Sequence, residues 1–145
     1  MCSEKVCLHV QIEILKRGHC EVSVRKRWPV LNHLGTIHAI ALCNAVEMAA
    51  GMLTEATVAS HLRWIPIGMT VQYKRKADTK YVKAVAKITR QQLEDWNLRE
   101  DENKVDVMVP VNVYNEREEI VLSGTVTMQL SRKKKTGSDK PVAKL

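Results

Sequence analysis

The chain has 145 residues, of which 45% are hydrophobic and 27% are charged. These values are typical of one soluble globular domain with a sizeable core, and they exclude a disordered chain. The net charge is +7, but residues 132–145 hold six Lys or Arg and one Asp and therefore supply +5 of it.

The first two elements that the sequence predicts are β-strands joined by a turn. Apolar residues alternate with polar ones over residues 5–15 and again over residues 20–28, as they do in half-buried strands. Lys-Arg-Gly-His lies between the two runs and supplies a turn. We therefore predict a β-hairpin.

A long apolar helix is predicted next, with Thr36 as its N-cap and an end at about Thr57. Within it, residues 37–54 read IHAIALCNAVEMAAGMLT. A helix that is apolar all round is normally buried inside a domain. Polar side chains interrupt the apolar stretch, so we predict no membrane-spanning segment.

Four further strands are predicted over residues 64–76, 80–90, 104–114 and 118–131. The clearest is 104–114, in which valine occupies every second position from Val105 to Val113. The polar segment 91–103 is predicted to be a loop or a short helical turn. The order β-β-α-β-β-β-β predicts an α+β fold, in which an antiparallel sheet wraps around the one apolar helix and buries it.

We expect a single domain over residues 1–131, followed by a basic, disordered tail over residues 132–145. No aromatic residue is interleaved with the lysines of the tail, so a nucleic-acid or membrane tether is the least favoured function class. The four cysteines are Cys2, Cys7, Cys20 and Cys43, and none has CxxC spacing. Neither a metal site nor a disulfide framework is predicted, and no signal peptide is visible. Reduced thiols suggest a cytoplasmic protein.

The most informative residue is Glu47, which carries the one charge between Ile37 and Thr54. Ionised carboxylates are almost never fully buried unless something pairs with them. If the helix is buried, Glu47 must be neutralised, hydrogen-bonded or kept for chemistry. The alternative to a catalytic role is a structural carboxylate bonded to the backbone or to Asn44.

The string NHLGTIHAIALCNAVEMA, with its Asn-x5-His-x8-Glu spacing, resembles the hotdog-fold thioesterases. Within them it is similar to the PaaI-like branch, and most of all to the DUF4442 group. The similarity covers roughly residues 5–131. It implies a hotdog fold and hydrolysis of an acyl thioester, with acyl-CoA as the expected substrate. It also implies no cofactor, no metal, and a homodimer or dimer of dimers with active sites between subunits.

The resemblance assigns the catalytic roles to four residues. Asn32 and His38 would position the thioester, and the backbone N–H of Ala39 would point at its carbonyl oxygen. A helix N-terminus suits an oxyanion because its N–H groups are free and carry partial positive charge. Glu47 would act as general base or as nucleophile. The resemblance further implies a site between subunits, in which Glu47 would face the His38 loop of the partner subunit. Residues nine apart on one helix could then serve one site.

Further residues are predicted to bind the substrate. Gly35 lies in the motif loop, where its simplest role is backbone conformation. The resemblance implies that the basic residues Lys74, Arg75, Lys76 and Arg63 meet the phosphates of coenzyme A. A solvated charged face is the alternative, and the sequence slightly favours it.

Two departures from the family pattern affect whether the protein can hydrolyse a thioester. Ala39 replaces the usual Gly, which leaves the backbone N–H in place. Active relatives often carry a Ser or Thr that orients the attacking water, and the corresponding positions here are Gly51 and about Pro66. Thr54 and Thr70 are candidate substitutes. The alternative is therefore a weakly active or non-catalytic protein that binds acyl-CoA or lipid. A hotdog hydratase is not favoured, because no Asp-x4-His pairing lies around the helix.

Overall fold

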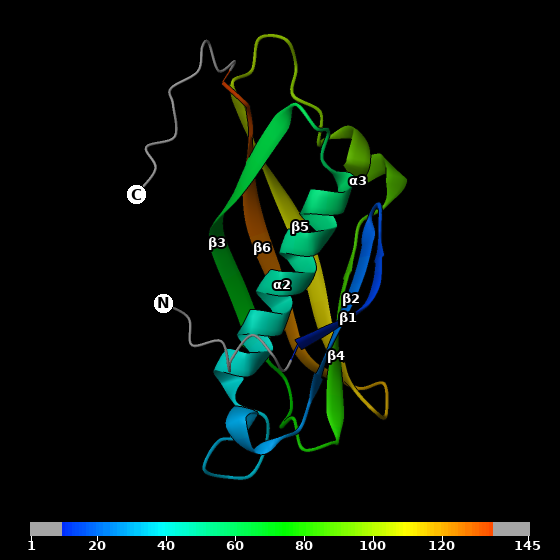
Figure 1. The fold of residues 1–145 in the computed structure, drawn as a ribbon, viewed down its shortest axis with the longest axis vertical. Coiled ribbons are helices and arrows are strands. Elements are labelled where there is room, and N and C mark those ends of the chain that lie inside the picture. The colour runs from blue at the N-terminus through cyan, green and yellow to red at the C-terminus, as the bar shows by residue number, and fades with distance from the viewer. Residues whose placement is uncertain (1–9, 135–145) are drawn as a thin grey trace, which may run out of the picture.

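A six-stranded antiparallel sheet and one long helix make up the fold in the computed structural model, which describes residues 10–134 (Figure 1). The predicted α+β class and the predicted order of strands and helix are confirmed. The strands are β1 (Val10–Lys16), β2 (His19–Arg25), β3 (Leu62–Tyr73), β4 (Tyr81–Lys87), β5 (Lys104–Asn115) and β6 (Ile120–Arg132). The helices are η1 (Trp28–Val30), α2 (Ala39–Thr57) and α3 (Arg90–Glu94).

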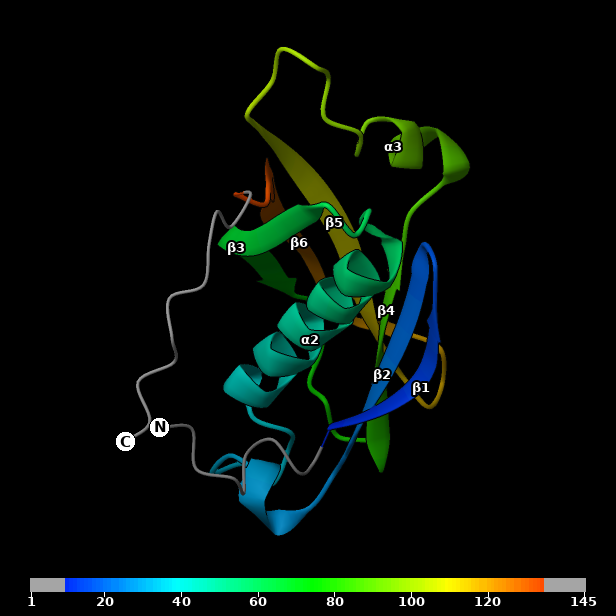
Figure 2. The same cartoon turned by 45° about the horizontal axis from the view of Figure 1, so that its top comes forward.

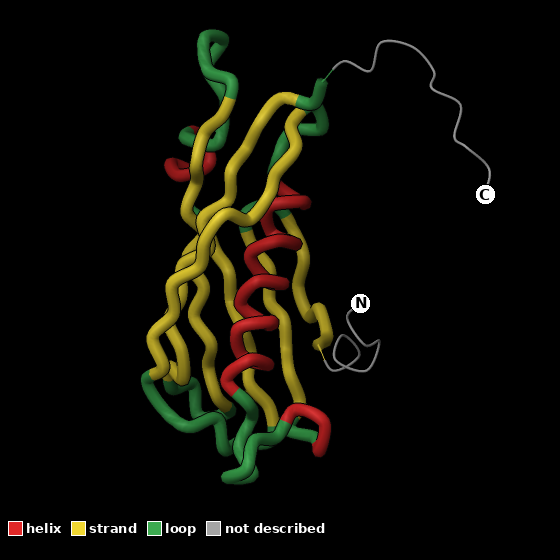
Figure 3. The backbone as a smooth tube through the Cα atoms, turned by 90° about the vertical axis from the view of Figure 1, so that its left-hand side faces the viewer, coloured by secondary structure: helices red, strands yellow, loops and turns green. Residues whose placement is uncertain are grey.

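The strands lie in the order β1-β2-β4-β5-β6-β3, so β1 and β3 form the two edges of the sheet. Figure 2 shows the sheet curving around α2, and Figure 3 shows the helix against one face of it. β3 follows the helix in the chain but pairs with β6, the last strand, along nearly its whole length. This long-range pairing carries β3 past the side of α2.

The period of two in β5 separates its two faces. Val107, Val109, Val111 and Val113 are buried beneath α2, whereas Met108 between them is 66% exposed. Successive side chains of a strand point to opposite faces, so this pattern places one face of the sheet on the core.

One side of α2 packs against the sheet. Its buried residues include Leu42, Val46, Ala49 and Leu53. The helix lies close to β6 because Gly124 has no side chain: a Cβ there would come within 3.4 Å of Val46 Cγ1 and 3.2 Å of Val71 Cγ1. α2 is long and apolar enough to cross a membrane by length and composition, but this packing identifies it as a core helix.

The expectation that Glu47 is buried is wrong for the single chain. Glu47 is exposed on the side of α2 that faces away from the sheet. A single curved sheet covers only part of the surface of a helix, so the apolar composition of α2 does not bury all of it.

The start of α2 also differs from the prediction. The N-cap is His38, whose Nδ1 accepts the backbone N–H of Ile40 at 3.1 Å. Thr36, the predicted cap, is bonded instead to Asn32. The polar segment after β4 contains the short helix α3, which begins with a capping box between Thr89 and Gln92.

The described chain continues past the predicted domain end. Arg132 is the last residue of β6, and the backbone N–H of Lys133 donates to the carbonyl of His61 at 3.0 Å. Most of the predicted tail lies outside the described residues, as do residues 5–9 of the first predicted strand, Cys2 and Cys7.

Candidate active site at the start of α2

A pocket of about 470 Å³ lies at the N-terminal end of α2. It brings together three parts of the predicted site that are far apart in the sequence: Asn32 of the motif loop, Ala39 of the first helical turn, and the basic run 74–76. Its full lining is Asn32, Leu34, Thr36, Ile37, Ala39, Leu42, Tyr73, Lys74, Arg75, Lys76 and Ala77.

Asn32 organises the motif loop. Its Oδ1 accepts the backbone N–H of Leu34 at 3.0 Å and that of Thr36 at 3.1 Å, and its Nδ2 donates to Thr36 Oγ1 at 2.9 Å. The backbone closes the same loop, since Gly35 donates to the Asn32 carbonyl at 3.0 Å. Gly35 has φ +72, a left-handed conformation that glycine adopts without steric cost. Asn32 and Gly35 therefore hold the loop in shape beside the pocket.

Backbone hydrogen bonds hold the basic run against this loop. Lys74 and Arg75 both donate to the Val121 carbonyl, at 2.7 and 3.2 Å, as the chain leaves β3. Ile37, one residue before the N-cap, donates to the Ala77 carbonyl at 2.9 Å. These contacts explain how residues 74–76 come to lie beside the helix start.

Acidic side chains partly offset the positive charge here. The Arg75 guanidinium lies 3.3 Å from Glu119, which also accepts a hydrogen bond from Arg117 at 2.8 Å. The hydrogen bonds from Arg117 and then from Asn115 hold the pKa of Glu119 below its usual value. The Glu119 carboxylate therefore forms an exposed ion pair with Arg75 at the edge of the pocket.

The first turn of α2 offers backbone donors. The first N–H groups of a helix have no partner within it. His38 takes that of Ile40, while among the described residues no hydrogen bond uses the Ala39 N–H. Nδ1 of His38 is used by this capping hydrogen bond, and the residue is exposed at the helix start.

Tyr73 is a pocket residue that the sequence did not reveal. It ends β3, and its hydroxyl lies 3.1 Å from the Sγ of Cys43 on the first turns of α2. This hydrogen bond is the main reason that the pKa of Tyr73 is raised, with a smaller effect of burial. No motif marks Tyr73, and its position depends on β3 passing beside the helix.

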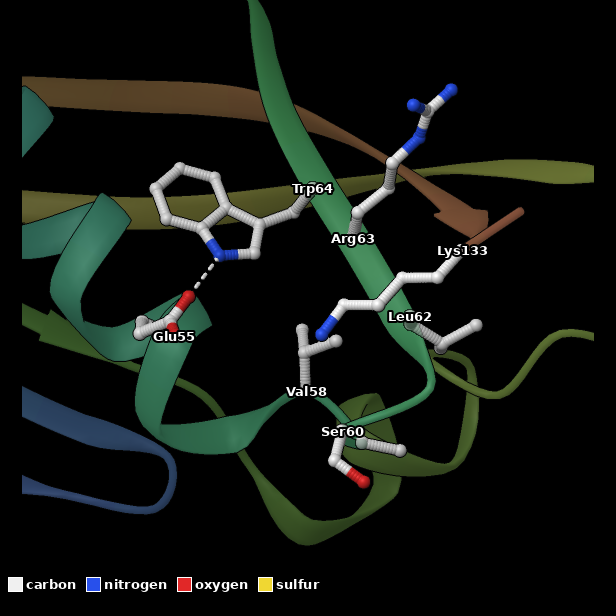
Figure 4. A pocket seen from close by; sticks show the side chains of 8 residues that line it. Glu55, Val58, Ser60, Leu62, Arg63, Trp64 and Lys133 are labelled. Atoms are coloured by element: carbon white, nitrogen blue, oxygen red, sulfur yellow. Dashed lines mark hydrogen bonds between the residues drawn. The ribbon is translucent and has the colours of Figure 1, made fainter. Parts of the chain in front are cut away.

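Four predicted site residues do not line this pocket. Gly35 and His38 are chain neighbours of residues that line it, whereas Glu47 and Arg63 lie elsewhere. Glu47 is eight residues beyond Ala39, which at the rise of an α-helix is about 12 Å along its axis. Arg63 lies near the opposite end of β3 from Lys74, about 36 Å away along an extended strand. Its Nε donates to Ser131 Oγ at 2.9 Å beside a separate pocket of about 520 Å³ (Figure 4). Neither residue lines the pocket at the helix start.

Neither Gly51 nor the candidate substitutes Thr54 and Thr70 place a hydroxyl beside Glu47 that could orient an attacking water. Gly51 is covered by Trp64, and the Thr54 hydroxyl donates to the Ala50 carbonyl at 2.7 Å. Thr70 lies between Met69 and Val71 on β3; since Val71 packs on the core, Thr70 points to the other face of the sheet. Within residues 10–134, no group of three or more His, Cys, Asp or Glu could hold a metal ion.

Comparison with known families shows which family the chain belongs to. The family model described as "Domain of unknown function (DUF4442)" matches residues 6–130. Among curated proteins, none matches the chain.

Solved structures share the fold. A crystal structure called genomics APC5556 is 42% identical with a TM-score of 0.75, over 86% of this chain and 78% of that one. PA5026 of Pseudomonas aeruginosa, described as a probable thioesterase, is 20% identical with a TM-score of 0.79, over 90% of each chain. BH2602 of Bacillus halodurans, solved with CoA, is 19% identical with a TM-score of 0.62, over 76% of this chain and 66% of that one. The last two likenesses establish the hotdog fold.

Proposed function

The chain belongs to the DUF4442 family, and we propose that it is a hotdog-fold hydrolase of acyl thioesters whose substrate is an acyl-CoA. The observation that carries this proposal is the pocket at the start of α2, where helix N–H groups, the Asn32 loop and the basic run 74–76 meet. The likeness to a probable thioesterase and to a protein solved with CoA agrees with it. We place the protein in the cytoplasm, as one domain that includes Arg132, the last residue of β6, followed by a basic tail.

The helix start is suited to the thioester carbonyl. When water attacks, negative charge develops on the carbonyl oxygen, and a preorganised N–H stabilises that charge. Ala39 supplies the N–H, and the partial positive charge of the helix N-terminus adds to it. Asn32 holds the neighbouring loop, and His38 caps the helix and fixes its first turn.

The basic run is suited to the phosphates of coenzyme A. Lys74, Arg75 and Lys76 line the same pocket as Ala39, so a phosphate of coenzyme A bound at this run would lie on the same side of the subunit as the helix start. Arg63 is excluded from this role in the same subunit because it lies at the other end of β3.

A second copy of the chain completes the site in this proposal. β3 is a long edge strand, and Ile65, Ile67 and Tyr73 on it are 53%, 48% and 53% exposed. A long, exposed, apolar edge strand is normally covered in a native protein. We propose that β3 pairs with β3 of a partner subunit, in a homodimer that can associate further into a dimer of dimers.

The partner then supplies the carboxylate. Glu47 lies on the exposed side of α2, about 12 Å from Ala39 of its own chain, and reaches a carbonyl held by the other subunit. As general base, Glu47 takes a proton from water while the oxygen attacks the carbonyl carbon; the C–S bond breaks and the thiolate of coenzyme A leaves. As nucleophile, the Glu47 carboxylate attacks the carbonyl carbon, the C–S bond breaks and the thiolate of coenzyme A leaves; water then hydrolyses the resulting anhydride, which releases the acid and restores Glu47.

The second candidate function is an acyl-CoA-binding protein with weak or no turnover. One observation favours it: Gly51 is covered by an indole, and Thr54 donates its hydroxyl to the backbone, so neither orients a water beside Glu47.

The test is release of free thiol from a panel of acyl-CoAs by the native protein, by Glu47→Gln and by the control Glu94→Gln on α3. We expect Glu47→Gln to lower kcat by about two or more orders of magnitude, the usual contribution of a general base. Glu94→Gln should retain full activity. Tight binding without turnover would select the binding protein, and turnover unchanged in Glu47→Gln would refute the role of Glu47.

A further inference from the structure

The Trp64 indole covers one turn of α2. A Cβ added to Gly51 would lie 3.2 Å from the Cη2 of Trp64 and 3.7 Å from its Cζ3. The indole Nε1 donates to Oε2 of Glu55 at 2.6 Å, as Figure 4 shows. The ring is therefore held at both ends, by van der Waals contact with Gly51 and by a charge-assisted hydrogen bond to Glu55.

The covered turn directly follows the proposed catalytic carboxylate. Glu47, Gly51 and Glu55 are spaced four residues apart and so lie on one face of the helix. One turn of an α-helix rises about 5.4 Å, so the indole begins about one turn beyond Glu47. Glu47 itself is exposed, whereas Gly51 is buried beneath the ring. The open face of α2 thus ends at Trp64.

Beyond the ring lies further space. The pocket of about 520 Å³ at the C-terminal end of α2 is lined on one side by Trp64 and Glu55 and also by Val58, Leu62, Arg63 and Lys133. Figure 4 shows the indole directed back toward the helix, away from Arg63 and Lys133. The ring and the Glu55 carboxylate therefore stand between the exposed face at Glu47 and this pocket.

We propose that Trp64 is the residue that sets acyl-chain length, because its indole blocks the path of an acyl chain along α2 about one helical turn beyond Glu47. The proposal rests on the proposed function, in which the reacting carbonyl lies beside Glu47. The enzyme then accepts short or compact acyl groups, since a longer chain following α2 meets the ring at Gly51. Glu55 is a positioning residue that keeps the ring closed.

The same contact explains why residue 51 carries no side chain. The Cβ of alanine would lie 3.2 Å from the indole Cη2, so the ring would have to move by a few tenths of an ångström to admit it. Gly51→Ala therefore shifts the ring without removing it, and it tests the role of the ring independently of Trp64 truncation.

The experiment compares kcat/KM for acetyl-, butyryl-, octanoyl- and palmitoyl-CoA. The variants are Trp64→Ala, Trp64→Leu, Gly51→Ala and Glu55→Ala, with Trp28→Ala as the matched control. Trp28 is 87% exposed on η1 and lines neither pocket. We expect the native protein to favour the short chains, and Trp64→Ala to raise the octanoyl-to-butyryl ratio about tenfold or more, the scale of methylene discrimination in a pocket. Gly51→Ala and Glu55→Ala should shift the ratio in the same direction by less, and Trp28→Ala should leave it unchanged.

A binding measurement distinguishes failure of this inference from failure of the proposed function, because binding can be followed without turnover. Titration calorimetry with non-hydrolysable thioether analogues of the same four chain lengths follows binding in every variant that melts cooperatively. Turnover with an unchanged length profile in Trp64→Ala, Trp64→Leu and Gly51→Ala overturns the inference and leaves the function standing. Suppose that no acyl-CoA is turned over, that the native protein binds only the shorter analogues, and that Trp64→Leu also binds the longer ones. That result would overturn hydrolysis and support the inference. Absence of both turnover and binding overturns both.

Discussion

Replacing Asn32 with alanine should weaken the whole protein, because this side chain holds the motif loop together. The substitution removes two hydrogen bonds from backbone N–H groups to Oδ1 and the contacts with the Thr36 hydroxyl. A hydrogen bond contributes about 0.5–1.5 kcal/mol net, and water replaces the one to the exposed Leu34 N–H most easily. We therefore expect Asn32→Ala to lower the free energy of unfolding by about 2 kcal/mol.

The matched variant is Asn32→Asp, which keeps an oxygen at Oδ1 for both backbone N–H groups and loses only the donor to Thr36. Its loss of stability should be well under that of Asn32→Ala, below about 1 kcal/mol. Urea denaturation at equilibrium measures both, and thermal melts should show a drop of about 6–10 °C for Asn32→Ala.

The two variants also separate a structural role of Asn32 from a role in substrate binding. If Asn32 only holds the loop, activity should follow stability, with Asn32→Asp close to the native protein. If its amide also donates to the substrate, Asn32→Asp should lose activity while remaining stable. Native stability in Asn32→Ala would refute our account of the loop, since three of its hydrogen bonds would then contribute nothing.

Three other predictions follow from specific contacts. Gly124→Ala should destabilise the protein by about 1–3 kcal/mol in urea denaturation, because the added Cβ meets Val71 and Val46; an unchanged midpoint would contradict the close packing of α2 on β6. Ile67→Lys at the β3 edge should shift the protein from dimer to monomer in light scattering and abolish turnover, and a native mass would refute pairing through β3. Burial, and to a lesser extent Glu21, raises the pKa of the Cys20 thiol, so iodoacetamide near pH 8 should label the partly exposed Cys43 before Cys20. The Cys20 thiol keeps its proton to a higher pH in the folded protein than in the unfolded chain, so the free energy of unfolding falls as the pH rises above about 8.5. Equal labelling of Cys20 and Cys43 in the folded protein would contradict the burial of Cys20.

The pattern of neighbouring residues was enough to predict the elements. Alternating valines in β5 and the apolar stretch of α2 report a local period, and each period arises from backbone geometry that adjacent residues share. The order of elements then left one economical arrangement, a sheet wrapped around the helix. The motif from Asn32 to Ala39 marked the loop and helix start that now border the pocket.

The sequence offered no way to tell which residue of the motif loop caps α2. Thr36 has the chemistry of an N-cap, but Asn32 engages both its hydroxyl and its N–H, and the helix begins two residues later at His38. Such a choice depends on which of two local hydrogen-bond patterns the surrounding chain favours.

Only the tertiary structure decided which face of α2 packs against the sheet and which residues lie on its exposed face. The pairing of β3 with β6 joins residues about sixty positions apart, and it carries β3 along the helix. That placement brings Tyr73 to Cys43 and Trp64 to Gly51, separates Arg63 from the basic run, and leaves Glu47 exposed. The sequence by itself determined the strands, the helix and the motif, because those follow from near neighbours. The surroundings of Glu47 follow from long-range packing, which no local pattern records.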